Sequence, residues 1–100
     1  MLAVSAVAHA DMNSDYFLKM SNGSKLERHS VEMYIGGVAK GYLNANGLLS
    51  AKNQPQLFCY DGDIDTKTAY ELTLQAIRES KTGNTVEALL LMKLMRLHPC

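Results

Sequence analysis

Apolar residues return at steps of three and four through the middle of the chain, and strand-like alternation is not found. The spacing predicts a helix from Ser24 to about Leu43, and one face of this helix holds Val31, Ile35, Val38 and Tyr42. Ser24 and Glu27 have the Ser-x-x-Glu spacing of a capping box, although Asn22 is a second candidate for the N-cap. We therefore expect a central helix with one buried face.

Two shorter helices are predicted in the second half of the chain. Asp65 or Thr66 caps a helix that reaches Ser80, with a face formed by Ala69, Leu72, Ala76 and Ile77. A last helix begins at Asn84, which serves as N-cap while Glu87 reaches back. It carries two apolar stripes, one of Ala88, Leu91, Met92 and Met95 and the other of Leu90, Leu94 and Leu97. A helix that is apolar around so much of its circumference belongs at the centre of a bundle or at a subunit interface.

The remaining segments complete an all-α prediction, a small helical bundle. Residues 11–23 suggest a short helix or an arm. Asn44-Ala45-Asn46-Gly47 is expected to end the central helix, and residues 48–58 to form a long ordered loop with one helical turn at most. Long loops in compact domains are usually functional or tied down, and Cys59 is the obvious tether here.

Gly37 and Gly41 lie inside the predicted central helix, where each glycine costs about 1 kcal/mol of helix propensity relative to alanine. Close approach of another helix across these two positions would offset that cost. The approaching helix belongs either to the same chain, which is the commoner arrangement in ordinary cores, or to a second subunit.

The first ten residues resemble the end of a signal peptide, because an apolar run closes on the small-x-small pattern Ala8-His9-Ala10. No basic segment precedes the run, so a first helix of the domain is the alternative. We expect residues 1–10 to be a signal peptide remnant and residues 11–100 to form the exported, periplasmic domain. Export would place both cysteines where disulfide bonds form and persist.

Cys59 and Cys100 are the only cysteines, so one intrachain disulfide is predicted. It would close a loop of about 42 residues, for which chain entropy gives roughly 4 kcal/mol of stabilisation. Free buried thiols and a reactive nucleophile are the alternatives. A nucleophilic cysteine needs a base and an electropositive setting, and only His98 stands near either position.

Composition and motifs favour contacts with proteins over catalysis. Ten basic and ten acidic residues give a net charge of zero, which does not favour nucleic acid or anionic membranes as partners. The three histidines lack the spacing of metal ligands, and Asp61, Asp63 and Asp65 start like a calcium loop without its later glycine and glutamate. We expect no catalytic residues, no metal, no cofactor, no membrane insertion and no enzymatic activity.

Three stretches taken in order resemble the Rap/Tai family of type VI secretion amidase immunity proteins. They are residues 34–43 with their glycines, Leu57-Phe58-Cys59, and the closing His98-Pro99-Cys100, and the resemblance covers about residues 16–100. Members often carry further cysteines in the region that corresponds to residues 26–33, and this chain has none there. The resemblance implies a periplasmic immunity protein, a homodimer that binds a cognate peptidoglycan amidase and protects the producing cell.

Such a protein would act by occlusion, with a polar loop entering the cleft of the amidase. Two loops qualify: residues Lys81, Thr82, Gly83 and Asn84 between the last two helices, and Tyr60, Asp61 and Asp63 beside the predicted disulfide. We favour the first loop because it lies at a tip where little else packs, and either loop is alternatively a simple solvated turn. The rival function is a periplasmic stress or holdase protein that uses exposed methionines to bind unfolded clients.

Overall fold

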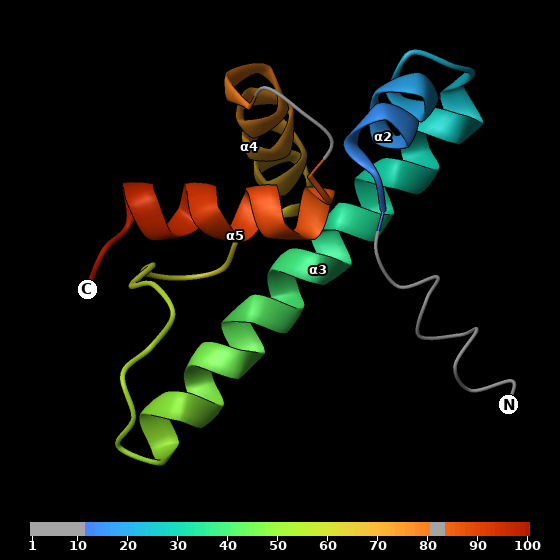
Figure 1. Ribbon diagram of the computed structural model, residues 1–100. Helices are drawn as coiled ribbons and strands as arrows, with labels where there is room; N and C mark the ends of the chain where they lie inside the picture. The colour runs from blue at the N-terminus through green and yellow to red at the C-terminus, as the bar shows by residue number, and fades with distance from the viewer. Residues whose placement is uncertain (1–11, 81–83) are drawn as a thin grey trace, which may run out of the picture.

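Helices arranged around one long central helix make up the fold of this computed structural model, which describes residues 12–80 and 84–100. In these ranges the helices are α2 (Ser14–Ser21), α3 (Lys25–Ala51), α4 (Thr66–Glu79) and α5 (Val86–Leu97). Figure 1 shows α5 crossing the middle of α3, while α2 and α4 lie near its first turns. The prediction of an all-α bundle closed by one disulfide is confirmed.

Helix α3 begins as the sequence predicts and ends later. The Ser24 side chain accepts a hydrogen bond from the Glu27 N–H, and Glu27 accepts one from the Ser24 N–H, which completes the capping box. The expected stop at residues 44–47 is wrong, because the helix continues to Ala51. Asn46 is buried, donates to the Phe58 carbonyl at 2.9 Å and accepts from the Leu57 N–H at 2.8 Å. These long-range hydrogen bonds explain why Asn46 lies inside the helix and not in a turn.

The buried faces of α3 and α4 are close to those expected. Helix α2 confirms the short helix predicted after residue 11, and the Asp65 side chain caps α4 by accepting from the Thr68 N–H at 2.8 Å. This backbone hydrogen bond lowers the pKa of Asp65. The core of fully or almost fully buried apolar residues consists of Phe17, Val31, Ile35, Ala39, Phe58, Ile64, Ala69, Val86, Leu90 and Leu94.

Helix α5 differs from its prediction at both its start and its buried face. Thr85, instead of Asn84, is the N-cap, and it accepts from the Ala88 N–H. Leu90 and Leu94 are buried, whereas Leu97 of the same stripe is exposed. Most of the other stripe also faces solvent, and its exposed members are Ala88, Met92 and Met95. Periodicity could not decide between the two stripes, since both are apolar.

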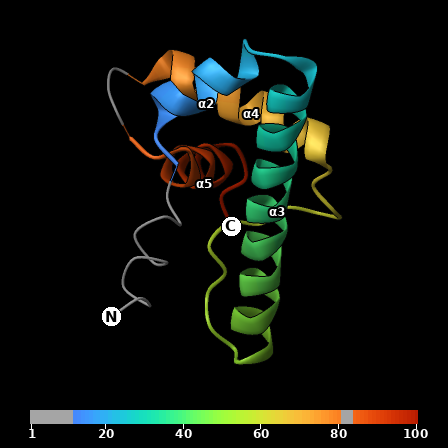
Figure 2. The same ribbon diagram turned by 90° about the vertical axis from the view of Figure 1, so that its right-hand side faces the viewer.

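The loop of residues 52–65 runs back along the second half of α3 and reaches the C-terminus, as Figure 2 shows. Phe58 and Ile64 are buried completely and hold the loop against the core. The Cys59 N–H donates to the His98 carbonyl at 2.7 Å, and Cys59 is bonded to Cys100 with 4.9 Å between their Cα atoms. The predicted tether between this loop and the C-terminus is confirmed.

The glycine of α3 that allows another helix to approach closely is not one of those predicted. A Cβ atom on Gly36 would lie 2.6 Å from Thr66 Oγ1, so this buried glycine is the one that permits close approach of α4. A Cβ on Gly37 or on Gly41 would have no atom of residues 12–80 or 84–100 within 4 Å. Close packing within one chain at Gly37 and Gly41 is therefore wrong, and contact with a second subunit stays a prediction.

Candidate partner-binding site

A pocket of about 200 Å³ lies between the end of α4 and α5, and we call it the α4–α5 pocket. Ser80, which ends α4, and Asn84, which precedes α5, both line it. The pocket thus lies beside the two ends of the first predicted loop, whose residues Lys81, Thr82 and Gly83 lie outside the described residues. Its lining consists of Ala76, Glu79, Ser80, Asn84, Leu89, Met92, Lys93 and Arg96.

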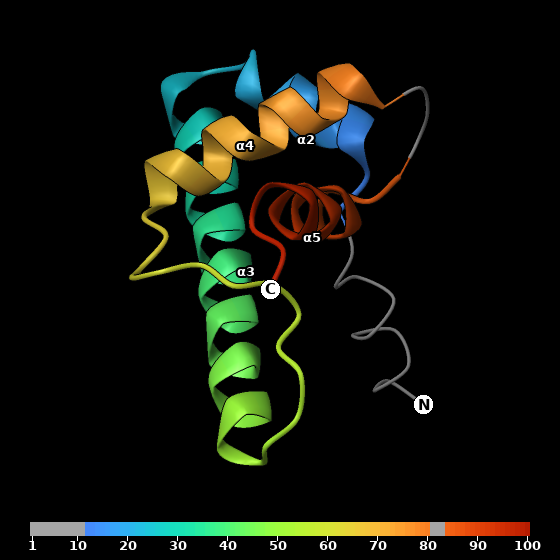
Figure 3. The same ribbon diagram turned by 90° about the vertical axis from the view of Figure 1, so that its left-hand side faces the viewer.

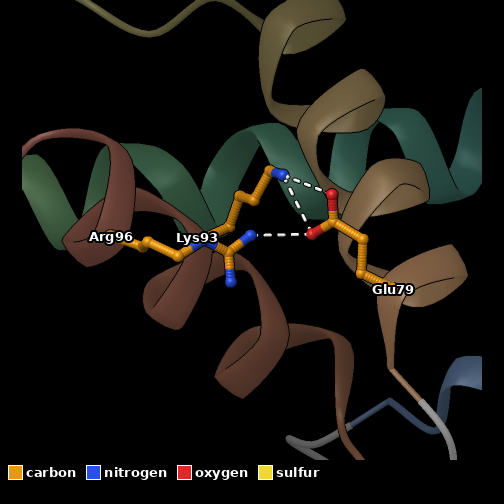
Figure 4. A network of polar contacts seen from close by, with 3 residues as sticks. All are labelled: Glu79, Lys93 and Arg96. Carbon is orange, nitrogen blue, oxygen red and sulfur yellow. Dashed lines mark hydrogen bonds and ion pairs between the residues drawn. The ribbon is translucent and has the colours of Figure 1, made fainter.

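Two cations share one carboxylate in this pocket (Figure 4). Lys93 Nζ lies 3.0 and 2.9 Å from the two oxygens of Glu79, and Arg96 Nη2 lies 2.7 Å from Glu79 Oε1. The Lys93 side chain is only 7% exposed, whereas Glu79 and Arg96 are 51% and 60% exposed. A buried ammonium needs such a partner, because an unpaired charge in the interior is strongly unfavourable.

Hydrogen bonds from Lys93 and then from Arg96 lower the pKa of Glu79 below its ordinary value of 4.5. A lowered folded-state pKa means that the stabilisation is present above pH 4.5 and is lost as the pH falls through the folded-state value. The network is therefore intact at neutral pH.

The second end of the loop is held by the first described residues of the chain. The Ser14 N–H donates to the Asn84 carbonyl at 3.3 Å, and the Val86 N–H donates to the Met12 carbonyl at 2.8 Å. The Glu87 carboxylate accepts from the Met12 N–H at 3.1 Å and from the Tyr34 hydroxyl. The prediction that Glu87 reaches back to the helix cap is therefore wrong. Its carboxylate instead connects α5 to α3 and to the N-terminal segment. The Asn84 side chain is left exposed.

The second predicted loop is packed more firmly. The Tyr60 ring makes an edge-on contact with His98, with 4.6 Å between ring centres, and it packs against the core. Asp63 forms an exposed ion pair with Lys40 at 3.1 Å, while Asp61 is exposed. The expectation that this loop lies beside the disulfide is confirmed, and Tyr60 belongs to the packed structure.

Sequence reasoning missed Glu79, Lys93 and Arg96, although one signal was present. Lys93 stands between Leu90 and Leu94 on the apolar side of α5, and a lysine at such a position calls for an acidic partner. The partner lies on another helix, so its identity could not be read from local spacing.

Other surfaces offer less defined chemistry. A wider groove of about 630 Å³ lies between the first half of α3 and α4, and both helices are seen together in Figure 3. Its lining mixes apolar residues with acidic and basic ones, including Met33, Tyr70, Arg28 and Glu71. In residues 12–80 and 84–100, no group of histidine, cysteine and acidic side chains is arranged to hold a metal ion. None of the described helices is long and apolar enough to cross a membrane.

No family model, no curated protein and no solved structure matches this chain.

Proposed function

We propose that this protein is a periplasmic immunity protein that binds a type VI secretion peptidoglycan amidase and inhibits it by covering its active site. The observation that carries the proposal is that contacts within the domain hold both ends of residues 81–84, and we call these two held ends the fixed base. Its first end follows Glu79, which is tied to α5 by Lys93, and its second end is tied to the N-terminal segment through Ser14. The resemblance to the Rap/Tai family of immunity proteins supplies the class of partner, a peptidoglycan amidase.

A fixed base suits an inhibitor that acts by occlusion. A loop whose ends are already held loses less conformational entropy when it enters a cleft, so more of its contact energy remains as affinity. The Cys59–Cys100 disulfide and the buried core keep the scaffold in one shape while the loop is bound. The proposed export depends on residues 1–10, which lie outside the described residues.

Changing the first loop should weaken inhibition without unfolding the domain. We expect Thr82→Arg combined with Asn84→Arg to raise the dissociation constant for the amidase by roughly tenfold to hundredfold, as for an interface hot spot. Thermal stability should change little, because the Asn84 side chain is exposed. Calorimetric titration measures the binding, and survival of cells that receive the amidase measures protection.

Asp61→Arg is the matched control, since Asp61 is also exposed but belongs to the second loop. It should bind and protect as wild type does. If Asp61→Arg fails to protect while the double variant protects, the second loop is the inhibitory one. Unchanged protection by both, together with no binding of an amidase by wild type, would remove the immunity proposal.

The proposal includes a homodimer, and one face of α3 supports it. Met33 and Leu48 are 56% and 66% exposed, and Gly37 and Gly41 lie between them on the same side of the helix. Figures 1 and 2 show that the second half of α3 extends beyond the other helices. An antiparallel second copy would place Met33 of one chain opposite Leu48 of the other and would bring backbones together across the glycines.

We expect Gly37→Leu to convert this dimer into a folded monomer. A Cβ at position 37 would have no atom of the described residues within 4 Å, so we expect overpacking against the second copy. Light scattering at micromolar concentration measures the change in mass. Gly36→Ala is the control, because its Cβ would lie 2.6 Å from Thr66 Oγ1 and should lower thermal stability instead of separating subunits. A wild-type protein that is monomeric at high concentration would contradict the dimer.

Three exposed methionines favour holdase activity as a second candidate function. Met33, Met92 and Met95 are between 45% and 56% exposed, and methionine surfaces adapt to varied apolar partners. A holdase suppresses aggregation of many unrelated unfolded proteins, whereas an immunity protein binds one folded enzyme tightly. An aggregation assay with two unrelated clients distinguishes these functions.

A further inference from the structure

The α4–α5 pocket has one more positive charge than negative. Among its described lining residues, Lys93 and Arg96 are the cations and Glu79 is the acid. Glu79 already accepts three hydrogen bonds from the two cations, so its charge is fully engaged. An additional anion at this place would meet a net positive potential.

Arg96 has donors to offer to such an anion. Only Nη2 bonds to Glu79, and the N–H groups on Nε and Nη1 have no partner within the described part of the chain. Because the side chain is 60% exposed, these donors can be reached from outside. Nε–H and Nη1–H point in different directions, so each can donate one charge-assisted hydrogen bond to a carboxylate oxygen.

The surroundings limit the size of the group that can bind. Ala76 and Leu89 give the pocket apolar walls, and Met92 lies at its side with 52% exposure. One surplus charge and a volume of about 200 Å³ suit a single carboxylate better than a dianionic phosphate.

We infer that the α4–α5 pocket is a carboxylate-binding site that receives an aspartate or glutamate side chain of the protein partner. The identity of that partner as an amidase depends on the proposed function, while the carboxylate site itself does not. The acidic side chain would bind between Ser80 and Asn84 on one side and α5 on the other, and it would fix the orientation in which the partner docks.

Arg96→Gln tests the docking role, with Arg78→Gln as its matched control. Both variants remove one exposed arginine charge, but Arg78 lies on α4 outside the pocket. Arg96→Gln should weaken binding of the amidase by roughly tenfold or more, whereas Arg78→Gln should change it by less than about twofold. Thermal melts of both variants show that they remain folded. Equal binding by Arg96→Gln and wild type would overturn the inference and leave the immunity function standing.

Sodium acetate tests the site without any partner. In nitrogen-15 spectra of the wild-type protein, the Arg96 Nε–H signal should shift and saturate as acetate replaces chloride at constant ionic strength. The Arg78 Nε–H signal should move much less. If the two signals move alike, or neither moves, the carboxylate site does not exist. If Arg96 responds to acetate and no amidase binds, the site stands and the proposed function fails.

Discussion

Cys100→Ser is expected to lower the free energy of unfolding by roughly 4 kcal/mol, because the disulfide restricts the unfolded chain over a loop of about 42 residues. The lost bond also removes the covalent attachment of residues 52–65 at Cys59, so that only non-covalent contacts, including those of Asn46, Phe58 and Ile64, would hold this segment. Urea titration followed by circular dichroism measures the difference.

Dithiothreitol provides the control for this variant. It should lower the stability of the wild-type protein by a similar amount and leave Cys100→Ser unchanged. The native protein should also contain no thiol that can be alkylated under non-reducing conditions. Two alkylatable cysteines, or equal midpoints for both proteins, would contradict the stabilising role of the bridge.

Phe17→Ala is expected to cost about 3 to 5 kcal/mol, as large-to-small changes of buried aromatic residues do. Phe17 is completely buried, its ring centre lies 5.7 Å from that of Tyr70, and it is the one buried apolar residue of α2. Chemical denaturation measures the effect, and a loss this large could leave the variant unfolded at 37 °C.

The neighbouring Tyr16→Ala is the matched control, since Tyr16 is 50% exposed on the other side of the same helix. Its stability should stay within about 0.5 kcal/mol of wild type. If the two variants lose stability equally, α2 does not pack on the face described here.

Local sequence patterns predicted a helix well where its capping residues and its buried apolar spacing indicate the same helix. The Ser24–Glu27 capping box and the Val31–Ile35 spacing fix the start and the buried face of α3. Local patterns failed where distant residues decide. Asn46 resembles a turn residue until its hydrogen bonds to residues 57 and 58 are known.

The candidate site was predictable in position but not in composition. A polar segment between two helices identifies residues 81–84, and its ends are found beside the α4–α5 pocket. The burial of Lys93 depends on Glu79, which lies 14 residues earlier on another helix. The contact of Met12 with Glu87 joins residues 75 positions apart, and no local spacing reports such a contact.

Titration of a type VI secretion amidase with this protein tests the immunity function most directly. Candidate amidases are sought first among the neighbouring genes, and soluble peptidoglycan fragments serve as substrate. Hydrolysis should fall linearly with added protein and stop when the two proteins are equimolar, since occlusion removes one active site for each bound chain. An amidase that keeps its full activity in excess folded protein, with no heat of binding, would contradict the immunity function.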